Sequence, residues 1–532
     1  MLHTGTGGSC MRIRTATLLV WCAAGLALAD SPPGRPPVAP YEVAGLQTPA
    51  TQIDRIVFDH LRKRGIQPAY PCSDAVFLRR AYIDVIGTLP TATEAAEFLA
   101  DPSPNKRTAL IDRLLQRPEF ADYWAMKWGD VLRIKAEFPV NLWPNAVQAY
   151  YRWVWESVRD NKPYDRFCRE LLTSSGSNFR VPPVNFYRAV QSKKPEGIAA
   201  AVALTFLCSR AEKWPKERLD GMAAFFSQVA YKSTYEWKEE IVFFDPDKPL
   251  SGRPIFPDGT EAKIPAGTDP REVFANWLIS PKNPYFARAA VNRVWFWLMG
   301  RGIIHEPDDI RPDNPPSIPE LLAYLEKEFV ASGYDQKRLF RLILNSQVYQ
   351  LSSIPASNHP DAETCFASYC VRRMDAEVLI DAICQITGTT ERYQSPIPEP
   401  FTYIPETNRT ITLADGSITS SFLELFGRPS RDSGTLSERI NRISTEQRLH
   451  LLNSSHINRK ITQGPKMVAL ARQGGTPEEV AKRLYLTFLS RYPTEEEIRR
   501  YTEYVSASVK PQEAFEDLAW TLVNSVEFLY RH

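Results

Sequence analysis

The chain has 532 residues, of which 43% are hydrophobic and 24% are charged, and its formal net charge is +2. This composition is typical of a soluble globular protein, and the length suits two or three domains of about 150 residues each. The near balance of charge gives no electrostatic basis for binding nucleic acid or an anionic membrane surface, so neither partner is expected.

The N-terminus has the three parts of a secretory signal peptide. A basic segment begins at Met11, an apolar run covers residues 16–28, and Ala27-Leu-Ala29 is a small-residue cleavage site. We expect a signal peptide over residues 1–29, with translation starting at Met1 or Met11, and therefore an extracytoplasmic protein, periplasmic or secreted. No later apolar run reaches the roughly 18 residues of a spanning helix, so no transmembrane segment is expected.

The first part of the mature chain is predicted to be helical. A proline-rich lead-in over residues 30–50 precedes helices at residues 53–64 and 73–86, the second with Ser73 as its N-cap and Gly87 at its end. Thr91 and Glu94 have the spacing of a capping box, which starts a further helix. We expect residues 51–235 to form one helical domain.

Short strands are expected in two places. Residues 239–245 and 253–264 are rich in strand-forming side chains and contain the turn signal Asp258-Gly259, so residues 236–269 are predicted to be a β-hairpin linker. A second hairpin is expected at residues 401–418. Residues 270–532 are predicted to be a second helical domain. The predicted fold is therefore mainly α: a multi-helical, two-domain protein with small β-hairpins.

The stretch from residue 283 to residue 353 is the most distinctive part of the second domain. Its apolar residues from Phe286 to Met299 recur at steps of three and four, which predicts a helix ended by Gly300. The polar segment that follows is crowded with acidic residues and prolines, which predicts a structured surface loop. Ser317 and Glu320 have the spacing of a second capping box, and a further helix is expected over residues 336–349.

This stretch also carries a family resemblance. The motifs NPYFARAAVNRVW, DDIRPDNPPS and LFRLILNSQVYQLSS follow one another here, FLRRAYIDVIGTLPT precedes them, and RRMDAEVLIDAI, FGRPSRD and LHLLNSSHINRKI come later. Together they resemble the planctomycete-type cytochrome-like family, whose two adjacent domains have no assigned biochemical function. The motifs keep one order over roughly nine-tenths of the chain, which makes the resemblance specific.

The resemblance also predicts that haem is missing. Haem-binding relatives attach the porphyrin through C-x-x-C-H in the first domain. Here Cys208 has no second cysteine three residues on, and no histidine occurs between His60 and His305. The protein is therefore identified as a haem-less variant, and no cofactor is expected. No two histidines have the i,i+4 spacing of a helical metal site, so no metal is expected either.

Removal of the signal peptide leaves six cysteines, and an exported protein can form disulfides. The closest pair in sequence, Cys365 and Cys370, is the candidate disulfide. Buried free thiols are an equally good interpretation of all six residues.

The candidate site joins one helix face to the polar loop after it. The face presents side chains at i, i+4 and i+7, and the loop contributes carboxylates and one guanidinium. Its members are Arg288, Asn292, Trp295, Asp308, Asp309, Arg311 and Asn314. If these groups pair and bury one another they form a structural clasp, which we favour. If they line an open cleft they bind a ligand or carry out chemistry.

Two functions from different classes fit the sequence. The preferred hypothesis is an uncharacterised exported envelope protein that acts as a non-catalytic binding or scaffold component, with an unknown envelope protein or polysaccharide as its partner. The alternative is an extracytoplasmic hydrolase that acts on polysaccharide with carboxylates of the 305–314 loop as acid and base. Tryptophans such as Trp124, Trp143 and Trp237 would suit sugar stacking if exposed, but packing in the core is the favoured interpretation.

Overall fold

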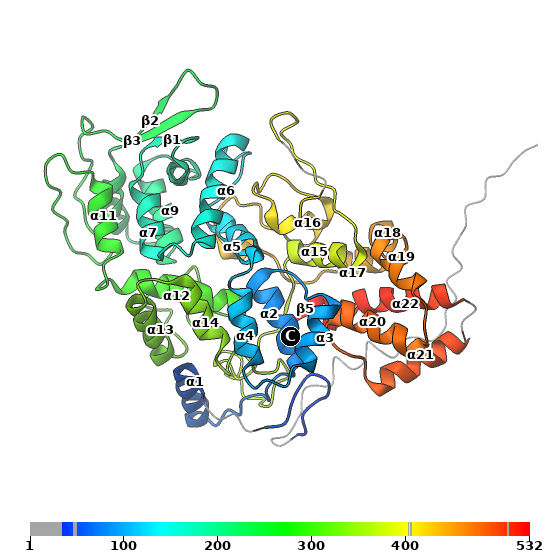
Figure 1. Cartoon of the computed structure of the whole chain (residues 1–532). Coiled ribbons are helices and arrows are strands. Elements are labelled where there is room, and N and C mark those ends of the chain that lie inside the picture. The colour runs from blue at the N-terminus through cyan, green and yellow to red at the C-terminus, as the bar shows by residue number, and fades with distance from the viewer. Residues whose placement is uncertain (1–34, 46–49, 403, 405–406, 508–509) are drawn as a thin grey trace, which may run out of the picture.

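The computed structural model describes residues 35–45, 50–402, 404, 407–507 and 510–532. The predicted signal peptide lies outside these residues. Figure 1 shows a mainly helical molecule with a few short antiparallel strands, which confirms the predicted fold class. No helix in the described ranges is long and apolar enough to cross a membrane.

The first half of the chain contributes ten helices and three strands to the described structure. They are α1 (Gln52–Lys63), α2 (Asp74–Ile86), α3 (Ala92–Ala100), α4 (Lys106–Leu114), α5 (Pro118–Val131), α6 (Pro144–Arg159), α7 (Tyr164–Thr173), α8 (Asn185–Arg188), α9 (Pro195–Leu207), α10 (Lys216–Ala223), β1 (Gly176–Ser177), β2 (Val229–Ser233) and β3 (Glu240–Phe244). Short 3-10 turns connect them at η1 (Pro182–Val184), η2 (Ala211–Lys213) and η3 (Ala224–Phe226).

The second half is helical except for one short pair of strands. Its elements are α11 (Pro270–Leu278), α12 (Pro284–Met299), α13 (Pro319–Ala331), α14 (Gln336–Leu344), β4 (Arg372–Arg373), α15 (Ala376–Thr387), η4 (Thr410–Thr412), α16 (Ser421–Leu425), η5 (Leu436–Glu438), α17 (Thr445–Asn453), α18 (Ser455–Gln463), α19 (Pro465–Arg472), α20 (Pro477–Leu489), α21 (Glu495–Ala507), α22 (Pro511–Val523), α23 (Val526–Leu529) and β5 (Tyr530–Arg531).

Local capping signals fix several helix ends as predicted. The side chain of Ser73 accepts from the amide of Val76 at the start of α2, and Gly87 ends the helix in the left-handed conformation with φ 59°. The capping box at Thr91 is present. The box predicted at Ser317 is wrong, because α13 begins at Pro319 with Ile318 as its N-cap. The Ser317 amide instead donates to the carbonyl oxygen of Ile303 across the preceding loop, at 2.8 Å.

The predicted strands are confirmed only in part. β3 pairs antiparallel with β2 from Val229 to Ser233 and with the short β1, giving the order β1-β3-β2. In the 253–264 segment a single bridge joins Ile255 to Glu261. The hairpin predicted over residues 401–418 is wrong, since the described residues of this segment contain the 3-10 turn η4 and no paired strands. Loop residues there are held by side-chain bonds instead of a ladder.

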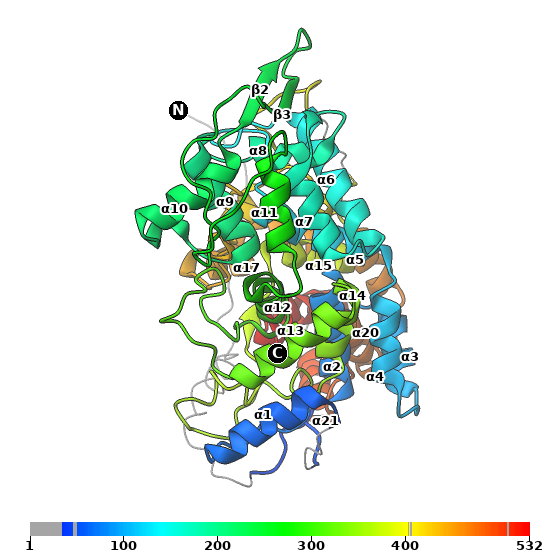
Figure 2. The same cartoon turned by 90° about the vertical axis from the view of Figure 1, so that its left-hand side faces the viewer.

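One hydrophobic core runs through both halves of the chain, from Ile53 to Leu529. Helix α12 lies in the middle, where it packs against α9 of the first half and against α13 and α14 of the second. Trp124 and Trp128 are buried in this core and lie 5.3 Å and 5.6 Å from the ring of Trp297. In Figure 2 the helices α6, α7 and α9 lie above α12 and α13, and α1 lies below them. The boundary between the two predicted domains therefore crosses a shared core and remains a prediction.

Candidate functional site

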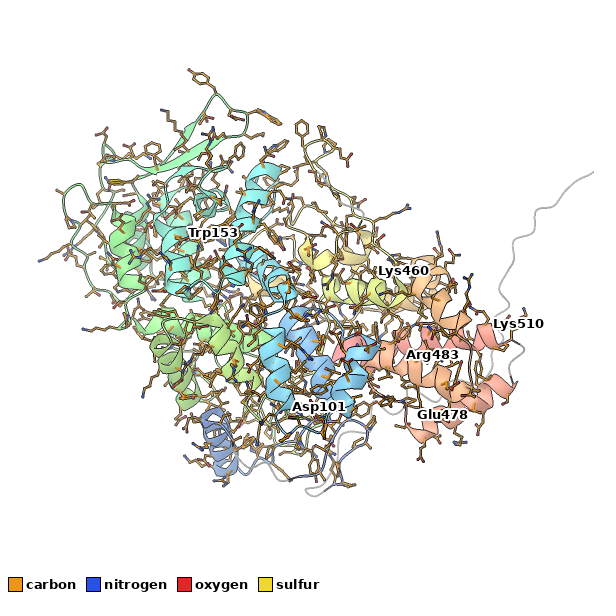
Figure 3. The ribbon with its side chains drawn as sticks, viewed as in Figure 1. Asp101, Trp153, Lys460, Glu478, Arg483 and Lys510 are labelled. Atoms are coloured by element: carbon orange, nitrogen blue, oxygen red, sulfur yellow. The ribbon has the colours of Figure 1, made fainter. Side chains whose placement is uncertain are left out.

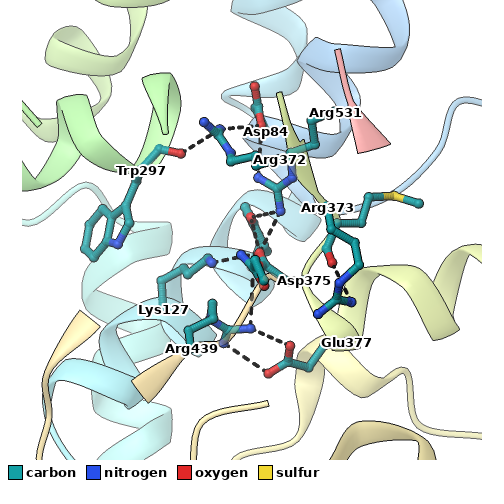
Figure 4. Close-up of polar contacts among 12 residues, drawn as sticks. Asp84, Lys127, Trp297, Arg372, Arg373, Asp375, Glu377, Arg439 and Arg531 are labelled. Atoms are coloured by element: carbon teal, nitrogen blue, oxygen red, sulfur yellow. Dashed lines mark hydrogen bonds and ion pairs between the residues drawn. The ribbon is translucent and has the colours of Figure 1, made fainter. Parts of the chain in front are cut away.

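The densest group of charged side chains lies inside the molecule, where α2, α5, β4, α15 and β5 meet (Figure 4). We call it the buried ion network. Its carboxylates are Asp84, Asp130, Asp375 and Glu377, and its cations are Lys127, Arg372, Arg428, Arg431, Arg439 and Arg531. By contrast, the outer helices carry exposed charges such as Glu478 and Lys510 (Figure 3).

Asp84 lies in the buried last turn of α2 and receives four hydrogen bonds. Its Oδ1 accepts from Arg372 Nη2 at 3.1 Å and from Arg531 Nη1 at 3.0 Å. Its Oδ2 accepts from the hydroxyls of Tyr349 at 3.1 Å and Tyr369 at 2.7 Å. Four donors, two from guanidinium groups and two from tyrosine hydroxyls, thus surround this carboxylate.

Asp375 is the second centre of the network. Its Oδ2 accepts from Lys127 Nζ at 2.7 Å, from Arg531 Nη2 at 2.6 Å and from the Tyr123 hydroxyl at 3.0 Å, while Asn441 Nδ2 donates to Oδ1 at 3.0 Å. Burial alone raises the pKa of Asp375, but the neighbouring cations outweigh it and hold this pKa well below its ordinary value. Arg531 thus joins Asp84 and Asp375, which lie in different halves of the chain.

Lys127 supplies the amine of the network, and the pKa of this amine is lowered. Its side chain is 9% exposed. Burial and, next, the charge of Arg439 lower its pKa to about 8, against the opposing charge of Asp375. A lysine amine shifted toward neutrality is a feature of nucleophilic and general-base sites. Here the same amine is committed to Asp375, so it serves as a partner of that carboxylate.

Arg439, the residue directly after η5, binds the two remaining carboxylates of the network. Its Nη2 donates to Asp130 Oδ2 at 2.6 Å and its Nη1 to Glu377 Oε2 at 2.6 Å. Burial raises the pKa of Glu377, but Arg439 and Arg428 outweigh burial and lower it to about 2. Arg431 Nε donates to the other oxygen of Asp130 at 2.9 Å. One carboxylate of α5 is thereby shared by two guanidinium groups from the second half.

Glycines make room for Arg431, whose side chain is fully buried. A Cβ at Gly129 would lie 3.0 Å from the guanidinium carbon, and a Cβ at Gly416 would lie 2.9 Å from its Cδ. Because the cations outnumber the carboxylates, several guanidinium groups also use backbone acceptors. Arg431 Nη1, for example, donates to the carbonyl oxygen of Ala414 at 2.8 Å. The network is thus a set of paired and hydrogen-bonded groups.

The sequence-predicted site is divided by the structure. On α12, Arg288 pairs with Glu326 of α13 at 2.8 Å, and Asn292 exchanges two hydrogen bonds of 2.9 Å with the backbone of Ile304. Trp295 is fully buried and packs its ring edge-to-face on Phe366. The three side chains therefore hold different neighbours and do not present a shared polar face.

The loop residues of the predicted site also separate. Asp308 is buried and lies 3.8 Å from Arg293, five residues after the expected Arg288, and it accepts from the amide of Leu436 at 2.6 Å. Asp309 pairs with Lys213 at 3.0 Å and with Arg311 at 3.5 Å. Asn314 donates to the carbonyl oxygen of Asp309 at 3.0 Å. The predicted contact of Arg288 with these carboxylates is wrong, and the loop is instead held by η2, α12 and η5.

The cysteines of the described residues are free thiols. Cys365 and Cys370, the candidate disulfide, are therefore not bridged in this structure. Cys208 ends α9 in the left-handed conformation, and its buried thiol donates to the carbonyl oxygen of Ala289 at 3.6 Å. Burial raises its pKa to about 12, which makes it a poor nucleophile. In the described part of the chain, no group of three or more His, Cys, Asp or Glu side chains is placed to hold a metal ion.

The sequence did contain a signal for the buried ion network. Helix α2 has no polar face, yet it contains Arg79, Arg80 and Asp84, all buried. Charged residues in a helix that is buried all round must find partners inside the protein. Asp375 and Glu377 lie at the N-terminus of α15, where the helix dipole favours carboxylates, but that local reason does not identify their partners. The pairing itself spans up to 447 residues of sequence, and no local pattern specifies it.

Two segments of the chain match models of known protein families. Residues 52–229 match the family model PSCyt2, protein of unknown function (DUF1549), and residues 270–505 match PSD1, protein of unknown function (DUF1553). The chain thus contains two adjacent domains of unknown function. No curated protein and no solved structure matches it. The buried ion network joins these two matched segments to each other and to β5, which lies beyond both.

Proposed function

We propose that this protein is an exported, non-catalytic binding or scaffold component of the cell envelope. The observation that carries the proposal is the buried ion network. This network is the largest concentration of ionisable groups in the described structure. Its ion pairs join the two matched segments and the β5 strand to one another. A binding or scaffold protein needs such rigidity between its parts, since rigid elements present a surface at a fixed geometry.

The N-terminal sequence supports export. The basic start, apolar run and Ala27-Leu-Ala29 site have the order of a signal peptide, and cleavage there would start the mature chain at Asp30. We also propose that the protein carries no covalently attached haem. The buried Cys208 thiol is sealed against α12 and has neither a partner cysteine nor a histidine beside it in sequence. Expression together with a cytochrome c maturation system should therefore give a colourless protein.

A polysaccharide hydrolase is the second candidate, and one observation favours it. Burial raises the pKa of Asp308, as a general acid requires, although the charge of Arg293 opposes the shift. The geometry of the loop is less favourable to a hydrolase, because neither Glu306 nor Asp309 is placed to act as a second catalytic carboxylate beside Asp308. Glu306 is 59% exposed beside His305, and Asp309 is paired with Lys213. The Asp308 carboxyl itself is enclosed by Arg293 and the Leu436 amide.

One experiment separates the two candidates. The native chain with an affinity tag after His532 is recovered from fractionated cells, with and without reversible cross-linking, and assayed for release of reducing sugar from envelope polysaccharide. The proposal predicts mature protein beginning at Asp30 in the envelope or extracellular fraction, cross-linked to a partner, with no sugar released. Cytoplasmic protein with an intact leader, or sugar release that Asp308→Asn abolishes, would overturn the proposal.

A further inference from the structure

A group of aromatic rings is exposed at one end of the molecule. The rings come from three separate segments: Trp143 just before α6, Trp237 in the turn between β2 and β3, and Phe401 in the loop after α15. We call them the aromatic patch. Trp237 is 60% exposed and Phe401 is 47% exposed. Figures 1 and 2 show the β2–β3 hairpin projecting from the body at this end.

The patch has a defined geometry. The ring centroids of Trp143 and Trp237 are 4.7 Å apart with their planes at 75°, and Phe401 lies 5.6 Å and 5.5 Å from them. Edge-to-face contacts of this kind stabilise aromatic pairs beyond simple burial. Trp143 is also packed against the core. The exposed rings of Trp237 and Phe401 therefore pack against the Trp143 ring, which the core holds in place.

The backbone around the patch is held in an uncommon conformation. Asn141, Trp143 and Lys238 have φ angles of 59°, 72° and 62°, in the left-handed region that bulky side chains rarely adopt. Such conformations are strained and persist where the surroundings enforce them. Their concentration on both sides of one exposed ring cluster indicates that the position of these rings is specified.

The chemistry of the patch selects one class of partner. We infer that the aromatic patch, with Lys238, binds polysaccharide made of pyranose rings. A pyranose presents a flat C–H face that stacks on an aromatic face, and its rim of hydroxyl groups needs hydrogen-bond partners. The Nζ of Lys238 lies 5.1 Å from the Trp143 ring and 5.5 Å from the Trp237 ring, where it can donate to that rim. The inference rests on the proposed function and names its partner.

Other partners fit the patch less well. The turn reads Tyr235-Glu236-Trp237-Lys238 and all four side chains are exposed, so insertion into a lipid bilayer would carry a carboxylate in with the rings. Two more exposed hydrophobic side chains lie in the loop before α6 and in the turn between β2 and β3. They are Phe138, which is 76% exposed, and Tyr235, and both are aromatic. The large hydrophobic side chains that are exposed in the described residues of these two loops are thus all aromatic. Ring stacking is the interaction that this composition serves.

The test is native electrophoresis of the full mature chain in gels that contain hydroxyethyl cellulose, a neutral polysaccharide, or alginate, an acidic one. Retardation by either gel is expected, and the choice of gel shows whether Lys238 prefers hydroxyl or carboxylate groups. Trp237→Ala and Phe401→Ala should each weaken binding about tenfold, because each removes one ring on which a sugar can stack. The matched control is Trp520→Ala, which removes a tryptophan that is 38% exposed on α22.

Three results would overturn the inference: no retardation in either gel, equal effects of Trp237→Ala and Trp520→Ala, or Trp237-dependent sedimentation with phosphatidylcholine–phosphatidylglycerol vesicles in place of glycan binding. Melting curves identify any variant that fails to fold, and Phe401→Ala keeps the test decisive in that case. A chain that is found cross-linked to an envelope protein but binds no glycan would contradict this inference alone and leave the proposed function standing.

Discussion

Asp375 offers the sharpest test of the buried ion network. Replacing it with alanine removes the acceptor of Lys127, Arg531 and Tyr123, at 2.7, 2.6 and 3.0 Å, and leaves two cations without that partner in an enclosed setting. Breaking a buried pair from one side typically costs about 3–5 kcal/mol, because the charge left behind stays desolvated. Arg531 keeps Asp84 as a partner, which places the expected loss toward the lower end of that range.

The assay is urea unfolding followed by tryptophan fluorescence and circular dichroism, with the free energy of unfolding compared between variants. The matched control is Asp112→Ala, which also removes a carboxylate bound by two nitrogens of one arginine, Arg341. That pair is 51% and 47% exposed, so its loss should cost less than about 1 kcal/mol. Equal, small losses for the two variants would refute the argument that the network fastens the fold.

Three further predictions follow from single contacts. Gly87→Ala should destabilise the protein by roughly 2–4 kcal/mol and Gly65→Ala by about 1–2 kcal/mol in thermal unfolding, since both glycines have positive φ but only a Cβ at Gly87 would meet the Tyr123 ring, at 2.5 Å. The pKa of Glu377 is lowered to about 2, so its stabilising contribution is full above pH 4.5 and is lost as the pH falls toward 2; the stability advantage of the wild type over Glu377→Gln should shrink in that window by roughly 3 kcal/mol. Arg288→Ala should cost about 1 kcal/mol in urea unfolding, as the loss of a partly exposed pair does; a loss above 3 kcal/mol would restore the predicted clasp.

Local signals explain which parts of the fold could be predicted. The ends of α2 at Ser73 and Gly87 follow from side chains a few residues away, and the sequence places them correctly. The same reasoning fails at Ser317, because a proline two residues later provides a competing helix start. The hairpin expected near Asp415 fails for a tertiary reason, since the Asp415 carboxylate binds the amide of Ala136, 279 residues away.

The candidate site was less predictable than the fold. The sequence correctly marked the 305–314 loop as structured, and Asp308 does pair with an arginine of α12, but with Arg293 instead of Arg288. Arg293 lies five residues after Arg288, about 140° further around the helix axis, so the loop contacts a different face of α12 from the expected one. The buried ion network depends on contacts between residues hundreds of positions apart, so its partners could be found only once the helices were placed in space.

Arg531 provides the most direct test of the central claim, that the network holds both matched segments and β5 together as one body. Hydrogen exchange measured by mass spectrometry on Arg531→Met should show lower protection in α2 and α15 together, because Arg531 binds Asp84 and Asp375 at 3.0 and 2.6 Å. Arg499→Met, which removes an exposed arginine of α21, should leave both helices unchanged. Loss of protection confined to residues 526–532 in Arg531→Met would contradict the account.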